Sequence, residues 1–200
     1  MRPKRRPGIY LAMETSKEFN LADAVAVLSR TPATLDVWLR GLPDVWAHTN
    51  EGPSHDGANT WSAFDIVGHL IAGERNDWMP RARIILEKGE TRPFDPFDRF
   101  AQERESQGKS LDQLLDEFAH LRRENLAALQ ALNLQKEDLT RRGTHPSLGP
   151  VTLGELLATW AVHDLTHLHQ LSRVMAHQYR DTVGPWGAYL GVLHCVGHGA

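Results

Sequence analysis

Hydrophobic residues recur at intervals of three and four along most of the chain, which is the spacing of one face of an α-helix. The clearest example follows Ser110, where the apolar face consists of Leu111, Leu114, Leu115, Phe118, Leu121, Leu129 and Leu132. Similar patterns predict helices over about 21–40, 62–88 and 152–179, and a short closing helix over 186–193. No run of alternating β-branched residues is long enough to predict a sheet. The pattern therefore predicts an all-α fold, a four-helix bundle with short additional helices.

Local signals place the ends of these helices. Ser62 followed by Asp65 is typical of a capping box, and Thr152 is expected to cap the last long helix. Thr31–Pro32 predicts a break in the first helical region, because proline is favoured in the first turn of a new helix. Pro80 predicts a kink in the second region, because it cannot donate a hydrogen bond to the carbonyl four residues earlier.

The segments between the helices are rich in glycine and proline. Residues 50–60 and 143–150 have the composition of loops, and residues 91–100 predict a packed connection. Specificity for a substrate is expected to lie in the loop residues 47–60 and 92–107, which carry no interpretable motif.

A chain of 200 residues is long enough for one well-filled core, and nothing in it demands a second domain. The start, Met1–Gly8, is basic, but no continuous hydrophobic stretch follows it as a secretory signal requires. We expect residues 1–16 to form a disordered extension and residues 17–198 to form one bundle domain.

Composition and charge narrow the classes of partner. A formal net charge of −3 and a pI near 6.4 argue against nucleic acid, which needs a concentrated basic surface. No apolar run approaches the roughly 20 residues that a membrane crossing needs. The single cysteine, Cys195, excludes an internal disulfide and a thiolate metal cluster, and it is compatible with the reducing cytoplasm, where we expect the protein. The expected state is a monomer or a homodimer.

Two histidines four residues apart, His163 and His167, lie inside the apolar stretch Leu153–Met175. Residues at this spacing lie about 40° apart on a helix, one turn above the other. Two imidazoles so placed can bind one metal ion from the same side. The alternative is a pair of hydrogen-bonded core histidines, because a buried polar group without a partner costs about 1–3 kcal/mol.

His69 is a candidate third ligand. It lies in the second predicted helix on a stripe of small and polar residues, which are Ser62, Asp65, Gly73, Asn76 and Pro80. The main apolar face of that helix points roughly the other way. Such a stripe cannot fill a core, so we expect it to border a groove. The alternative is that His69 belongs to a polar surface that faces solvent.

Three segments together resemble the DinB-like superfamily. They are Trp61–Leu70, which carries the lone His69, Gly143–Leu157, a loop leading into the last long helix, and His163–Gln170. The resemblance covers about residues 21–193. It implies a four-helix bundle with a metal triad, one histidine from the second long helix and an HxxxH pair from the fourth. It therefore implies a metal role for His69, His163 and His167.

Three neutral imidazoles leave a bound ion at its full charge and leave positions for water or substrate. We expect one divalent transition metal ion, with zinc or nickel suiting imidazole best and iron also compatible. Three further residues are candidates for a second layer around the ion. Asp164 could orient a ligand imidazole or form a salt bridge between helices, and Glu74 could act as a general base or pair with a buried arginine. Gln170 could hydrogen-bond substrate or water.

The resemblance implies several activities. Some members of the superfamily are thiol-dependent S-transferases or isomerases that use bacillithiol or mycothiol, others are metal-dependent hydrolases, and some are stress-associated proteins without established activity. We expect a metal-dependent enzyme acting on a small molecule, with thiol-dependent S-transfer ahead of hydrolysis. A cationic site binds a thiolate as readily as hydroxide, and the sequence shows no convincing pair of carboxylates as base. The non-enzymatic alternative is a metal-binding module in which the ion only supports the bundle.

Overall fold

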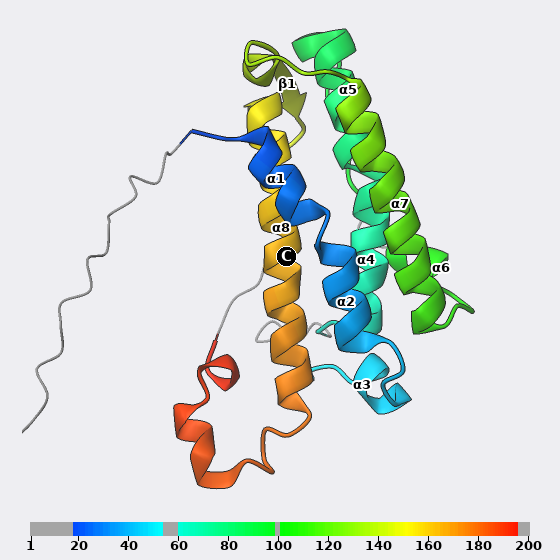
Figure 1. The fold of residues 1–200 in the computed structure, drawn as a ribbon, viewed down its shortest axis with the longest axis vertical. Coiled ribbons are helices and arrows are strands. Elements are labelled where there is room, and N and C mark those ends of the chain that lie inside the picture. The colour runs from blue at the N-terminus through cyan, green and yellow to red at the C-terminus, as the bar shows by residue number, and fades with distance from the viewer. Residues whose placement is uncertain (1–17, 54–59, 99–100, 196–200) are drawn as a thin grey trace, which may run out of the picture.

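The computed structural model describes residues 18–53, 60–98 and 101–195. Helix α8 (Leu153–His177) runs along much of the molecule, and three other helical columns accompany it, with α1 crossing in front of α8 in the view of Figure 1. These columns are α1 with α2 (Leu21–Leu28 and Thr31–Leu39), α4 with α5 (Ala63–Asn76 and Trp78–Lys88), and α7 (Leu111–Ala131). The predicted four-helix bundle is thereby confirmed.

The short elements lie between these columns or follow α8. They are α3 (Asp44–His48), η1 (Gly89–Thr91), α6 (Ala101–Glu105), η2 (Asp138–Thr140), η3 (Gly184–Tyr189) and η4 (Gly191–Leu193). The closing helix predicted over 186–193 is therefore two 3-10 segments rather than one helix. The predicted disordered extension, residues 1–16, and the last residues of the predicted domain lie outside the described residues.

The first column breaks where the sequence predicts it, at Thr31–Pro32, with the proline in the first turn of α2. The second column differs from its prediction. Instead of one helix kinked at Pro80, α4 ends at Asn76 and α5 begins at Trp78, so Pro80 lies in the first turn of the new helix. A proline there removes no internal hydrogen bond, because the first N–H groups of a helix have no partner within it.

A small β-hairpin replaces the loop predicted over 143–150. Strand β1 (Arg142–His145) pairs antiparallel with β2 (Gly149–Thr152). The strands have four residues each and contain glycine and proline, so they are too short to show a period of two in the sequence. A side chain at Gly143 would place a Cβ 2.7 Å from Ile85, so the hairpin approaches α5 as closely as only glycine permits.

Two hydrophobic clusters fill the bundle, one toward each end of α8. The first cluster includes residues of α1, α5 and the N-terminal half of α8, among them Leu28, Trp78, Ile85, Leu157 and Trp160. The second includes residues of α2, α4, α7 and the C-terminal half of α8, among them Leu35, Ile66, Leu114, Phe118 and Leu171. The part of α8 between Ala161 and Leu168 therefore lies at the junction of the two clusters.

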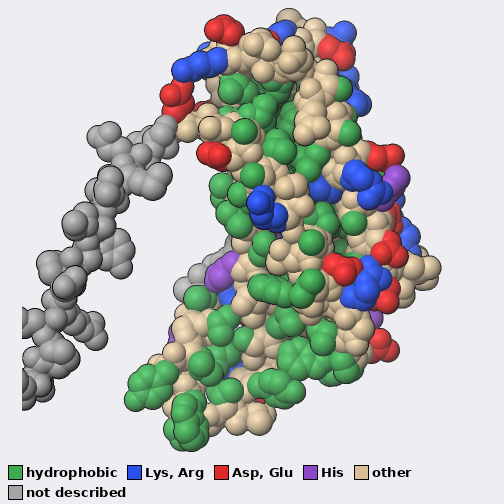
Figure 2. Space-filling view, viewed as in Figure 1, with side chains coloured by type: hydrophobic (Ala, Val, Ile, Leu, Met, Phe, Trp, Pro, Cys, Tyr) green, Lys and Arg blue, Asp and Glu red, His purple; other side chains and the backbone are tan. Residues whose placement is uncertain are grey.

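Some large hydrophobic side chains remain outside these clusters. Figure 2 shows such side chains gathered over the lower part of the face that it presents. Exposed residues of this kind come from α2, α3, the hairpin turn, α8 and the chain after α8, and they include Val37, Val45, Leu148, Val162 and Trp186. Within the described part of the chain, every helix is too short or too polar to cross a membrane.

Candidate metal centre

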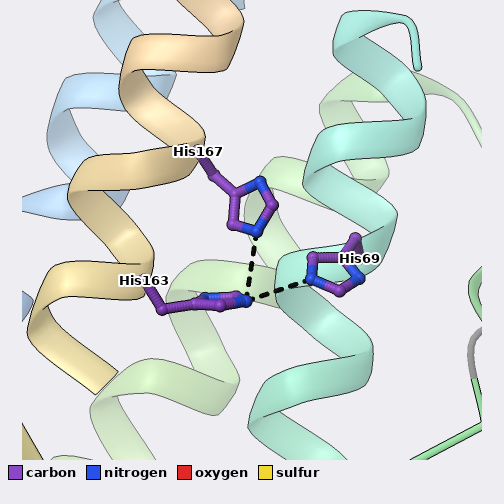
Figure 3. Close-up of side chains that lie close together, drawn as sticks. All are labelled: His69, His163 and His167. Carbon is purple, nitrogen blue, oxygen red and sulfur yellow. Dashed lines mark hydrogen bonds between the residues drawn. The ribbon is translucent and has the colours of Figure 1, made fainter. Parts of the chain in front are cut away.

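Three histidine rings meet at the junction of the two clusters. His69 extends from α4, and His163 and His167 extend from consecutive turns of α8 (Figure 3). The Nε2 atom of His163 lies 3.0 Å from Nε2 of His69 and 3.1 Å from Nε2 of His167. The ligand atoms of all three residues lie within 4.8 Å of one another.

These separations fit one metal ion. Two nitrogens that each lie about 2.1 Å from a tetrahedral ion are about 3.4 Å apart. The two short Nε2 separations, 3.0 and 3.1 Å, are smaller than that by a few tenths of an ångström. Small rotations of the rings would therefore open the cluster enough to hold an ion.

His69 is buried, with 8% of its surface exposed. The alternative that it belongs to a solvent-facing polar surface is therefore wrong. The part of the stripe around His69 is covered, since Gly73 is also buried and a Cβ added there would lie 3.2 Å from Nε1 of Trp78. A small residue at this position therefore lets the Trp78 ring pack against the helix.

Hydrogen bonds and burial fix the protonation of two of the rings. Nδ1 of His167 donates a hydrogen bond to Oε1 of Gln170 at 2.8 Å, which leaves the Nε2 lone pair directed at His163. Burial, followed by the nearby His167, His69 and Arg122, lowers the pKa of His163 from 6.5 to about 2. His163 is therefore neutral near pH 7, and a neutral imidazole is the form that binds metal.

An aromatic wall, made of Trp61, Trp78 and Phe97, surrounds the rings. The Trp61 ring lies 4.7 Å from the ring of His69 and 6.0 Å from that of His167, between centroids. Phe97 lies 5.7 Å from His69, and Trp78 lies 5.0 Å from His163. The wall shields the histidines from water on several sides.

No local pattern in the sequence predicts the aromatic wall. Trp61 belongs to a segment that resembles the family, and Phe97 lies in a connection without a readable motif. Phe97 does fall within the loop 92–107, where specificity was expected. Residues 54–59 and 99–100 of the two specificity loops lie outside the described residues.

A buried ionic network lies next to the triad along α8. Arg122 of α7 donates hydrogen bonds to both oxygens of Asp164, at 2.6 and 2.9 Å, and to Oε1 of Glu74, at 3.0 and 2.8 Å. Oγ1 of Thr31 donates to Asp164 at 2.5 Å, and Nε1 of Trp160 donates to Glu74 at 3.0 Å. Burial lowers the pKa of Arg122, but the hydrogen bonds and charges of Asp164 and Glu74 outweigh it and raise that pKa.

The three candidates for a second layer thus have different surroundings. Gln170 contacts a triad histidine directly, whereas Asp164 and Glu74 form the ion pairs that were the alternatives for these residues. Arg122 was not named from the sequence. Its signal was a cation four residues after Phe118, on the apolar face of the third long helix.

Comparisons with known proteins agree with this architecture. The model of the DinB superfamily matches residues 27–171, a range that contains all three histidines. Among solved structures, the chain is similar to YfiT from Bacillus subtilis, described as a probable metal-dependent hydrolase with an unusual four-helix bundle topology. That similarity has a TM-score of 0.63 at 22% identity and covers 91% of this chain and 94% of the other. No curated protein matches the chain.

Proposed function

The chain belongs to the DinB superfamily, and we propose that it is a metal-dependent enzyme in which His69, His163 and His167 hold one divalent transition metal ion. The observation that carries the proposal is the convergence of three Nε2 atoms from two helices, with His163 held neutral by burial. Zinc or nickel is the proposed ion, with iron as the next choice, because borderline metals favour imidazole ligands.

A divalent ion bound there supplies positive charge that lowers the pKa of a bound water or thiol. The protein's own residues prepare the site for this chemistry. Gln170 keeps the Nε2 atom of His167 unprotonated, and the aromatic wall limits access of water to the rings. Because all three histidines come from one chain, the site serves a monomer and a homodimer equally well.

We propose thiol-dependent transfer as the reaction class. The two carboxylates that could act as a general base for an attacking water, Glu74 and Asp164, are both bound by Arg122. Their oxygens already accept hydrogen bonds from Arg122, so neither carboxylate is free to bind an attacking water. Cys195 is not among the described residues that contact the triad, so we assign the reacting thiol to a low-molecular-weight cosubstrate.

Metal-dependent hydrolysis of a small molecule is the second candidate. The description of YfiT as a probable metal-dependent hydrolase favours it, and the two chains share the fold over most of their lengths. At 22% identity this likeness concerns the fold, so the reaction has to be measured on this protein.

The test uses zinc-loaded and nickel-loaded protein with 1-chloro-2,4-dinitrobenzene, with and without N-acetylcysteine. In transfer, the thiolate sulfur forms a bond to the ring carbon, chloride leaves, and the thiol proton passes to solvent. We expect consumption that needs both metal and thiol and is lost in a His163→Ala/His167→Ala variant. Turnover of 4-nitrophenyl acetate without thiol would support the hydrolase instead. Inactivity in both assays would contradict both transfer and hydrolysis of these substrates. The protein would then be interpreted as a metal-binding module.

A further inference from the structure

A second polar pair, Asp77 and Arg81, is buried where α4 meets α5. Their side chains are 14% and 10% exposed, and Oδ1 of Asp77 and Nε of Arg81 form an ion pair one helical turn apart. Neither of these two buried atoms makes a hydrogen bond of normal geometry with any described residue. Removing two charges from water without such bonds costs several kcal/mol per ion, so the pair needs an explanation beyond stability.

The guanidinium of Arg81 is held on two sides. Its Nε edge faces Asp77, and its plane lies over the ring of Phe94, with its carbon 5.3 Å from the ring centroid. In the described part of the chain, the two terminal nitrogens form no salt bridge with a carboxylate. A planar fork of N–H donors that is fixed in place matches the two oxygens of a carboxylate.

Two paths through the structure place Arg81 near the triad. The ring of Trp78 contacts that of His163. Trp78 and Arg81 are three residues apart on α5, so they lie on the same side of that helix, about 4.5 Å apart along its axis. Phe94 lies under Arg81 and Phe97 contacts His69, and three residues of chain span at most about 11 Å. Trp78 and the segment 94–97 thus link Arg81 to the triad by two separate sets of contacts, and we take the guanidinium and the histidines to face the same part of the bundle.

We infer that Arg81 is a binding residue of the same site and that it receives a carboxylate carried by the substrate or by its thiol partner. Asp77 then acts as a positioning residue that orients the guanidinium from its Nε edge. This inference rests on the proposed function, and it adds to that function a chemical class for the ligand: a small molecule with a carboxylate at one end and the reacting group at the other.

The test uses mercaptocarboxylates with two to six carbons, each compared with its neutral amide. Binding to zinc-loaded protein is measured by calorimetry for wild type, Arg81→Gln and the matched control Arg83→Gln, whose side chain is exposed on the same helix. In wild type and Arg83→Gln we expect at least one acid to bind ten times more tightly than its amide. In Arg81→Gln we expect that preference to fall below twofold while the Kd of the amide is unchanged.

The design separates this inference from the proposed metal site. Zinc binding is titrated first. If the protein binds no zinc, the proposed function is contradicted, and the acids and amides are compared on the metal-free protein instead. Equal binding of acids and amides by wild type, absence of binding by both series, or a preference that survives Arg81→Gln would overturn the role of Arg81. If Arg81→Gln does not fold, as followed by circular dichroism, Asp77→Asn/Arg81→Gln replaces it, because that variant leaves no unpaired charge.

Discussion

Gln170 accepts a hydrogen bond from Nδ1 of His167 across less than one turn of α8. Because an amide oxygen only accepts, the proton of this imidazole is on Nδ1 and its Nε2 lone pair faces the other histidines. The orientation and the tautomer of the ring are therefore set by the protein before any ion binds, which reduces the reorganisation that binding requires.

We predict that Gln170→Leu weakens zinc binding about 10- to 100-fold, because the ring loses the acceptor that fixes its tautomer. Gln170→Glu keeps an acceptor at the same place and should bind zinc at least as well as wild type. Competition against a chromophoric chelator measures both affinities. An unchanged affinity in Gln170→Leu would mean that this hydrogen bond has no part in metal binding.

We predict that the protein binds one zinc or nickel ion per chain and that His163→Ala or His167→Ala abolishes it. His69→Ala should weaken binding at least tenfold, since only the pair on α8 remains. His169→Ala is the matched control, because His169 is exposed on the same helix. Elemental analysis of the purified variants gives the occupancy, and full occupancy in the His163→Ala/His167→Ala variant would exclude this metal site.

We predict that acid destabilises the metal-free protein through His163, whose pKa is lowered to about 2 by burial and by its neighbours. Between pH 6.5 and that pKa the unfolded chain takes up a proton at this residue and the folded chain does not. The free energy of unfolding therefore falls as the pH falls below 6.5, by about 2 kcal/mol at pH 5. Urea denaturation at several pH values should show a flatter dependence for His163→Gln than for wild type.

We predict that Arg122→Met lowers the free energy of unfolding by about 3–5 kcal/mol. The substitution leaves Glu74 and Asp164, both fully buried, without their cation. Neutralising the carboxylates as well, in Arg122→Met/Glu74→Gln/Asp164→Asn, should recover part of the loss. Arg123→Met, at an exposed neighbouring position, should change the denaturation midpoint little; an equal loss in both single variants would contradict a special role of the network.

We predict that a chelator lowers the Tm of the metal-loaded protein but leaves most of its helical circular dichroism. Both hydrophobic clusters are assembled from residues outside the triad, so the helices have a core without the ion. Loss of all helicity on removal of the metal would support the alternative in which the ion is mainly structural.

Features encoded by neighbouring residues could be predicted from the sequence. The capping box at Ser62 and the N-cap at Thr152 depend on residues close in sequence, and the side-by-side placement of His163 and His167 follows from helical geometry alone. The partner His69 could be proposed from its place on a polar stripe, but only a family resemblance linked it to the pair.

Features that depend on packing between distant segments could not be predicted. Trp61 and Phe97 reach the histidines from connecting segments, and no local pattern shows where a connection leads. The sequence allowed an arginine as partner of Glu74, but the choice of Arg122 among the arginines requires the arrangement of α4 against α7. The sequence does not predict the hairpin because its strands have only four residues each and contain glycine and proline.

The ionic network around Arg122 also restricts how the bundle can assemble. Thr31, Glu74, Arg122 and Asp164 come from four different helical columns. The guanidinium of Arg122 binds Glu74 and Asp164, and Thr31 donates a hydrogen bond to Asp164. Leucine-rich faces can slide past one another by a helical turn and still bury similar area, but a displaced column would leave a charge in the core without its partner. A shifted or reordered arrangement of the columns would therefore lose several kcal/mol relative to the native one. We expect this single arginine to make one register and one topology far more stable than their competitors.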